Sequence, residues 1–248
     1  MSDDFEIEGS KIGIAAGNTR VTSFISTSHL QAADFFLQQS KDIEDAHDND
    51  SIPQTGQMSK AAYRSYCTSA ITSVVAFLDS TINELYVNMS GPGGEQHYPQ
   101  INDSRFWGLI DSDVGETASR DSVLGKYNNM LLLAGKNEIS LGEDPGQAAR
   151  YVCWLRNKYL HYEPKNVEIV GKTETGGEYG FEESLRNRFD LSPFTGDGNP
   201  FFPDQCQSCG CAEWSIKRSL AFTEEFFDRI GIDRPYDDML EHIEIDPP

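Results

Sequence analysis

The stretch "YVCWLRNKYLHYEP", residues 151–164, contains the residue types that could do chemistry. It is rich in aromatic and aliphatic side chains, yet it carries Arg156, Asn157 and His161 within about one and a half turns of a helix. Arginine offers a permanent charge and two parallel donors, and histidine can take up and release a proton near neutral pH. An arginine and a histidine that converge make a compact phosphate site that needs no metal.

The spacing of these residues places two of them on one helix face. Asn157 and His161 are four residues apart, which puts them within about 40° of each other around a helix axis. Arg156 is about 140° from His161, but its long side chain can fold back toward the same edge. A structural role is the alternative: Arg156 pairs with Asp79 or Glu84, His161 caps the helix C-terminus, and Asn157 bonds to the long helix over residues 59–88.

The elements that must position this stretch are mostly helices. Apolar periodicity and end signals predict helices over about residues 26–45, 59–88, 121–134, 144–162 and 211–230. The clearest is the second helix, whose apolar stripe is Ile71, Val74, Val75, Leu78, Ile82 and Leu85.

End signals and apolar faces define the other helices. Asp144 as N-cap and Pro145 at the first position predict the start of the helix that carries the motif. Gly135 and Gly231 are predicted to end two further helices. The apolar face predicted for the first helix, which begins at Ser26 or Ser28, is Leu30, Phe35, Phe36 and Leu37.

These elements predict a mainly α fold. We expect residues 1–248 to form a single domain, an up-and-down bundle of about five helices with small β excursions. Residues 1–25 are predicted to form an N-terminal arm or hairpin. Residues 92–120 and 163–208 are predicted to be loop or β insertions, the first of them anchored by Phe106 and Trp107.

The charge balance is strongly acidic. The sequence has 40 acidic and 20 basic residues, a formal net charge of −20 and a pI near 4.5. This pattern is typical of a protein from a salt-loving organism, where molar salt screens self-repulsion, and an ordinary acidic protein is the alternative. Acidity argues against nucleic-acid binding, but this argument weakens in high salt.

We expect no signal peptide, because the stretch "MSDDFEIEGS" is acidic and lacks the basic start and apolar run of one, and no segment has an apolar run long enough to span a membrane. The five cysteines are an odd number, which fits a reduced protein better than a secreted one. We therefore expect a cytoplasmic location and no membrane partner.

The segment "CQSCGC" places Cys206, Cys209 and Cys211 within six residues. A structural zinc site needs four ligands, and no second pair with suitable spacing follows. The favoured interpretation is a buried thiol cluster at the start of the last helix, and zinc binding stays open as the alternative. No phosphate loop, metalloprotease or serine-hydrolase motif is present, so we expect neither a metal nor a cofactor.

The motif Arg156-Asn157-x-x-x-His161, followed by Tyr162, resembles the HEPN superfamily (the higher eukaryotes and prokaryotes nucleotide-binding domain), whose motif is Arg, four to six residues, His. "SAITSVVAFLDSTINELY" resembles the long helix of that family, "LGKYNNMLLLAGK" the segment before the motif helix, and "CAEWSIKRSLAFTEEFFDRIG" the final helix. The resemblance covers less than half of the chain. Asp79 stands where related sequences have Glu.

The resemblance implies a homodimer in which two motifs face each other across a composite cleft. In active members this cleft cuts RNA without a metal, so Arg156 and His161 would be catalytic with Asn157 between them. Asp79 and Tyr162 would support them. The implied function is an endoribonuclease of a toxin–antitoxin or defence system, in which an antitoxin protein is a further partner.

Two alternatives to this enzyme remain. The first is a non-catalytic module that binds a nucleotide or RNA, or that serves assembly. The second is a helical protein whose motif is purely structural. Few basic residues lie near the motif in the sequence, namely Arg150, Lys158 and Lys165. Because binding a polyanion normally takes several phosphate contacts, this weighs against the nuclease.

Overall fold

Helix α2 (Gln57–Ser90) is the longest element of the computed structural model. The residues that the structure describes are 23–48, 57–163, 169–170, 173–174, 182–196 and 198–243. Within these ranges the protein is mainly helical, which confirms the mainly α part of the predicted fold. The other long helices are α1 (Ser26–Asp48), α6 (Val123–Leu133), α7 (Gly146–Leu160) and α9 (Cys209–Ile230).

Short elements connect the long helices. The short helices are α3 (Gly94–His97), α4 (Ser104–Ile110), α5 (Asp113–Ala118), α8 (Glu182–Leu185), α10 (Asp237–Leu240) and the π-helical turn η1 (Phe201–Gln205). Strands β1 (Ile169–Val170) and β2 (Thr173–Glu174) pair antiparallel, with Ile169 opposite Glu174. A short strand in this insertion was predicted.

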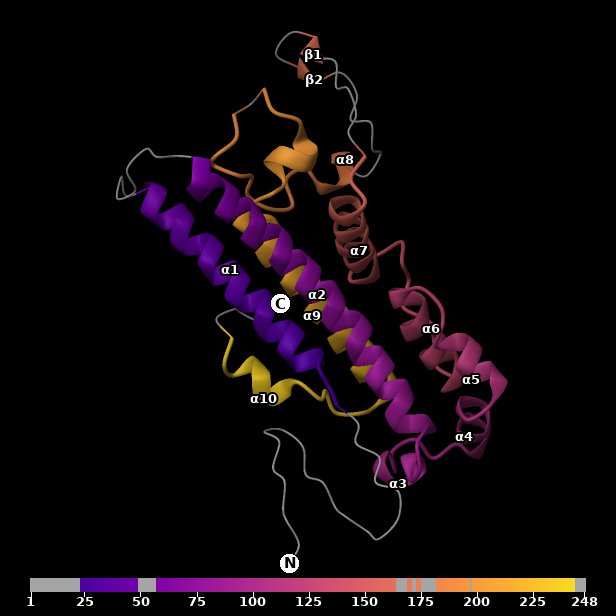
Figure 1. The fold of residues 1–248 in the computed structure, drawn as a ribbon. Helices are drawn as coiled ribbons and strands as arrows, with labels where there is room; N and C mark the ends of the chain where they lie inside the picture. Colours follow the sequence, from indigo (N-terminus) through magenta and orange to yellow (C-terminus); the bar gives the residue numbers. More distant parts are fainter. Residues whose placement is uncertain are drawn as a thin grey trace, which may run out of the picture.

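Helices α1 and α2 run antiparallel along most of their length (Figure 1). The start of α1 meets the end of α2, where Ser26 Oγ donates to Glu84 at 2.6 Å. The opposite ends meet where the Tyr63 hydroxyl donates to Glu44 at 2.6 Å. The apolar stripe predicted for α2 is buried in full: Ile71, Val74, Val75, Leu78, Ile82 and Leu85.

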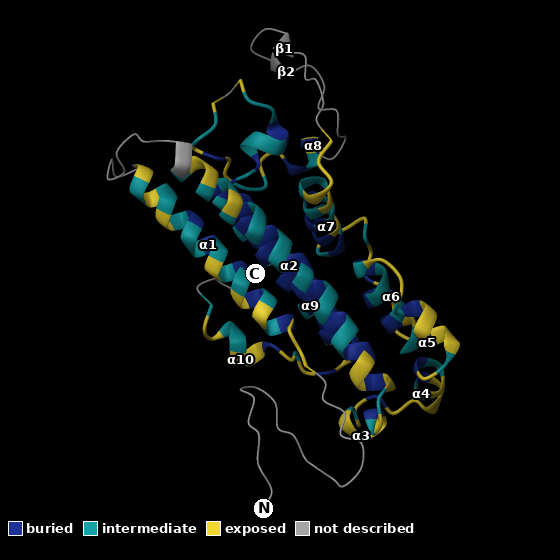
Figure 2. Cartoon of the chain, in the orientation of Figure 1, coloured by how far each residue is buried: buried dark blue, intermediate teal, exposed yellow. Residues whose placement is uncertain are grey.

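Helix α9 packs against α2, and α7 packs against both of them. Ser208 caps α9 by accepting from the Cys211 amide, and Gly231 ends it with a φ of 81°, as predicted for a C-terminal glycine. In Figure 2 buried residues follow the lengths of α2 and α9. Residues at intervals of three and four along the sequence predict one apolar face for α9, and all of them are buried: Ile216, Leu220, Thr223, Phe227 and Ile230.

The apolar face of α1 was predicted wrongly at one position. Leu30, Ala33 and Leu37 are fully buried, whereas Phe35 is 56% exposed. Buried positions at intervals of three and four residues form one stripe, and Phe35 lies about 200° around the axis from Ala33. A large apolar side chain on the wrong face therefore stays in solvent.

The insertion over residues 92–120 contains short helices where loops or strands were predicted. The side chain of Asp103 accepts from the Arg105 amide at the start of α4, and Ser112 accepts from Val114 at the start of α5. These local caps offset part of the high cost of starting so short a helix. The predicted anchor is confirmed for Phe106, which is fully buried.

The prediction of an arm or hairpin over residues 1–25 falls almost entirely outside the described residues. Among the helices that the structure describes, none has both the length and the apolar character to cross a membrane.

Candidate functional site

Helix α7 starts and ends one to two residues away from its predicted limits. Pro145 occupies the N-cap position, one residue later than the predicted Asp144, and provides no side-chain cap. Asp144 instead faces Arg188, with 3.6 Å between Oδ1 and the guanidinium. The helix ends at Leu160, and His161 is its C-cap residue, whose backbone N–H donates to the Asn157 carbonyl at 2.9 Å.

One face of α7 packs into the protein. Val152 and Leu155 are fully buried. One turn further on, the Tyr159 ring lies 5.1 Å from the Phe202 ring, and its hydroxyl is 3.2 Å from Cys206 Sγ. The spacing of Ala148, Val152, Leu155 and Tyr159 in the sequence predicts this inward face, and the structure confirms it. The face holds the end of α7 against η1.

The three motif residues lie on the remaining surface of the same helix. The side chains of Asn157 and His161 are exposed, and that of Arg156 is half-buried. Within the part of the chain that the structure describes, none of the three side chains forms a hydrogen bond or an ion pair. The end of α7 thus presents a guanidinium, an amide and an imidazole that no described residue engages in a side-chain hydrogen bond.

The carboxylates proposed as structural partners of Arg156 are engaged elsewhere. Asp79 accepts from Lys126 Nζ at 2.7 Å. Glu84 accepts from the backbone amides of Ile25 and Ser26 at the start of α1, at 2.7 and 2.9 Å. The structural alternative for Arg156 is therefore wrong for both carboxylates.

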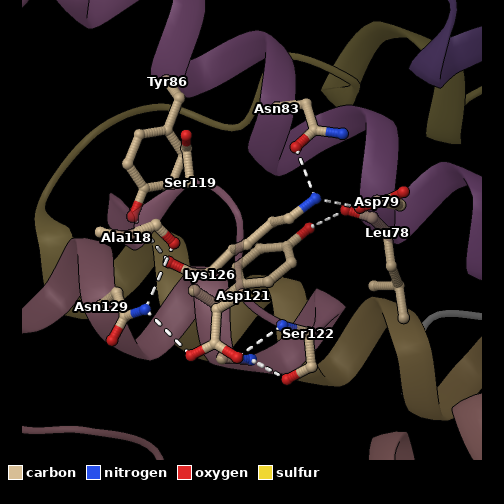
Figure 3. A network of polar contacts seen from close by, with 12 residues as sticks. Leu78, Asp79, Asn83, Tyr86, Ala118, Ser119, Asp121, Ser122, Lys126 and Asn129 are labelled. Carbon is tan, nitrogen blue, oxygen red and sulfur yellow. Dashed lines mark hydrogen bonds and ion pairs between the residues drawn. The ribbon is translucent and has the colours of Figure 1, made fainter. Parts of the chain in front are cut away.

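Lys126 connects α6 to α2 and was not singled out from the sequence. Its ammonium group donates to Asp79 and, at 2.8 Å, to Asn83 (Figure 3). The neighbouring Tyr127 is fully buried and donates to the Leu78 carbonyl at 2.7 Å. A lone lysine in an apolar helix is a signal for such a contact, because a buried ammonium needs an acceptor.

The network of Figure 3 continues to the start of α6. The Tyr86 hydroxyl donates to the Lys126 carbonyl at 3.1 Å. Asp121 accepts from the Ser122 amide and from Asn129, and the first of these bonds is the main reason that its pKa is lowered. The network therefore fixes α6, and with it Lys126, in front of Asp79.

Cys153 links Asp79 to the motif electrostatically. It lies on α7 one turn before Arg156, and burial raises its pKa to about 12. The Arg156 charge opposes this rise, whereas Asp79 adds to it. Both charges therefore act on the same thiol.

Tyr162, the other predicted supporting residue, is 45% exposed just beyond His161. Its ring lies 6.1 Å from that of Phe202. Basic side chains nearby lie over aromatic rings: Lys158 over Trp154 at 5.4 Å, and Arg150 over Tyr151 at 5.6 Å.

The cysteine cluster lies at the start of α9, as predicted. Cys206 and Cys211 are fully buried, and the Cys209 thiol donates to Glu44 at 2.7 Å. Burial raises the pKa of Cys206 and of Cys209 to about 12, which favours the neutral thiol over the thiolate that a metal binds. Among the described residues, no group of three or more His, Cys, Asp or Glu side chains could hold a metal ion.

Comparisons of the chain with protein families, with curated proteins and with solved structures find no match. The assignment of a function therefore rests on the chemistry at the end of α7.

Proposed function

We propose that this protein is a HEPN-like, metal-independent endoribonuclease. The observation that carries the proposal is the end of α7, where the exposed Asn157 and His161 and the half-buried Arg156 bond to no other described side chain. An arginine and a histidine with free hydrogen-bonding groups supply the charge and the proton transfer that phosphodiester cleavage requires.

In the proposed reaction, His161 takes the proton of a ribose 2′-hydroxyl, and the 2′-oxygen attacks the adjacent phosphorus. Arg156 stabilises the negative charge that builds up on the phosphoryl oxygens. The bond to the 5′-oxygen breaks, and this oxygen takes a proton from a second histidine. The products are a 2′,3′-cyclic phosphate and a 5′-hydroxyl.

A second copy of the chain supplies that second histidine in our proposal. The helices would form an up-and-down bundle whose α7 ends meet across a two-fold axis. Leu160 is 54% exposed beside His161, and Tyr162 is 45% exposed, so apolar surface for such a contact is available. In this arrangement Asp79 and Tyr162 support the composite site, in a cytoplasmic toxin or defence protein that an antitoxin protein can bind.

A non-catalytic RNA- or nucleotide-binding or assembly module is the second candidate. Two basic side chains near the motif, Lys158 and Arg150, lie over aromatic rings. They are therefore less available to hold an RNA substrate, which favours the module over the nuclease. The net charge of −20 also favours the module, because an acidic protein repels a polyanionic RNA substrate. Such a module would bind its ligand through Arg156 and His161 and leave it intact.

Cleavage of RNA by single variants tests the proposal. Arg156→Ala and His161→Ala should each lower the rate of cleavage of total RNA by at least about 100-fold, the usual contribution of a general acid or base. Cleavage should leave 2′,3′-cyclic ends and persist in EDTA. The matched controls are Arg150→Ala, an exposed arginine on the same helix, and His242→Ala, an exposed histidine beyond α10.

Equal cleavage by the wild type and both motif variants would contradict the proposal. A wild type that binds RNA but does not cleave it, even in molar KCl, would favour the non-catalytic module. Circular dichroism spectra of the variants should match that of the wild type, because the substituted side chains make no hydrogen bond or ion pair with described residues.

A further inference from the structure

A groove of about 970 Å³ lies on α2 beside the end of α7. One wall is α2 from Lys60 to Ser73, and Leu160, the last residue of α7, contributes to another. Because His161 follows Leu160 directly, the groove opens next to the residues of the proposed nuclease site. The sequence did not suggest this groove, since no motif marks it.

The groove differs in charge from the rest of the molecule. The described residues that line it include Lys60 and Arg64 but no Asp or Glu, although about one residue in six of the chain is acidic. The ammonium group of Lys60 forms no ion pair with any described residue. Among the described residues, Arg64 forms an ion pair with Asp204 alone, at 3.8 Å between guanidinium and carboxylate, and its buried Nε has no hydrogen-bond partner there. Lys60, which no described carboxylate neutralises, and Arg64, whose Nε is unsatisfied and whose ion pair is long, thus provide positive charge for an anion in the groove.

Hydroxyl groups follow the same helix face. Ser65, Ser69 and Ser73 line the groove at intervals of four residues, about 6 Å along the axis. Their hydroxyls form no hydrogen bond with described residues. Two half-buried phenylalanines, Phe36 and Phe194, also line the groove. Cations and hydroxyls are typical contacts of phosphate and sugar, and aromatic rings can stack on bases.

We propose that this groove binds single-stranded RNA next to the scissile phosphodiester. Lys60 and Arg64 would contact phosphates, and Ser65, Ser69 and Ser73 would donate to phosphate or ribose oxygens. The proposal rests on the proposed nuclease function and deepens it by placing the flanking RNA on α2. The described lining residues carry two cations and no carboxylate, and Asp204 approaches one of these cations from outside the lining. This excess of positive charge beside the motif suits a polyanion.

Binding of an RNA that cannot be cleaved tests the groove separately from catalysis. The probe is a short, fluorescently labelled single-stranded RNA with 2′-O-methyl groups, followed by anisotropy with the full chain. Lys60→Gln and Arg64→Gln should each weaken binding by about 3- to 10-fold. Each should also make the negative slope of log K against log[salt] shallower by about 0.7, the value for one phosphate contact on a single strand.

Lys136→Gln and Arg105→Gln are matched controls, because both residues are exposed and lie outside the lining of the groove. They should leave the affinity and the salt slope unchanged. Cleavage by each variant is measured in parallel as a function of RNA concentration, and the groove variants should raise the KM.

The two proposals fail in different ways. If Lys60→Gln and Arg64→Gln bind as the wild type does, the groove proposal is wrong, even where His161→Ala abolishes cleavage. If these two substitutions weaken binding but neither the wild type nor any variant cleaves RNA, the groove proposal is supported and the nuclease proposal is wrong. Unchanged RNA affinity together with a loss of dimer in sedimentation would assign the groove to a second copy and overturn its role in RNA binding.

Discussion

At the residue scale, Glu84 holds the start of α1 onto α2. Its carboxylate accepts from two backbone amides, those of Ile25 and Ser26, and from the Ser26 hydroxyl. It therefore does for α1, from another helix, what an N-cap side chain does locally.

We predict that Glu84→Ala lowers the free energy of unfolding by about 1–2 kcal/mol, because amides of a helix start lose their acceptor. Urea unfolding followed by circular dichroism measures this change. Glu138→Ala removes an exposed carboxylate that makes no contact of this kind and is the control. Equal stability of the two variants would show that water replaces Glu84 at no cost.

The motif residues and their partners differ in how far the sequence could predict them. That Val152 and Leu155 pack inward while Asn157 and His161 face outward follows from helical period alone. The contact of Lys126 with Asp79 joins residues 47 apart, and only the packing of α6 on α2 brings them together. The groove could not be predicted from the sequence either, because its walls come from separate parts of the chain that only the packing brings together.

At the scale of the element, long amphipathic helices were the most predictable part of the fold. Helices α2 and α9 follow from their apolar stripes and from Gly231. Residues 94–118 were not predicted as helices, because short helices depend on local caps such as Asp103 more than on periodicity. Phe35 was placed inward from hydrophobicity alone, whereas the period of α1 assigns it to solvent.

The ion pair between α6 and α2 is the element-scale contact whose energy we predict. The Lys126 side chain is 12% exposed and that of Asp79 is 41% exposed, so the pair is only partly screened by water. A double-mutant cycle with Lys126→Met and Asp79→Asn should give a coupling energy of about 1 kcal/mol from urea unfolding.

The exposed pair Glu116–Arg120 within α5 and its C-terminal end is the matched control. Its side chains are 60% and 73% exposed, so its coupling energy should stay below about 0.5 kcal/mol. Equal coupling energies in the two cycles would mean that the partly buried position of Lys126 adds nothing to the attachment of α6.

At the scale of the whole molecule, the charges are unevenly distributed. The net charge is −20, yet the described lining of the α2 groove contains two cations and no carboxylate. Self-repulsion destabilises so acidic a compact state, and salt reduces it by shortening the Debye length from about 10 Å at 0.1 M to about 3 Å at 1 M. The same salt weakens contacts with RNA phosphates, so stability and RNA affinity should respond to salt in opposite directions.

We predict that raising KCl from 0.1 M to 1 M stabilises the protein by about 2 kcal/mol, or about 4–8 °C in Tm for a chain of this size. Calorimetry at pH 7 measures this shift. The control is the same salt series nearer the sequence pI of about 4.5, where protonated carboxylates leave less repulsion to screen and the shift should shrink. An unchanged or lower Tm at pH 7 would contradict adaptation to high salt and favour an ordinary acidic protein. RNA cleavage would then have to be sought at low salt, where phosphate contacts are strongest.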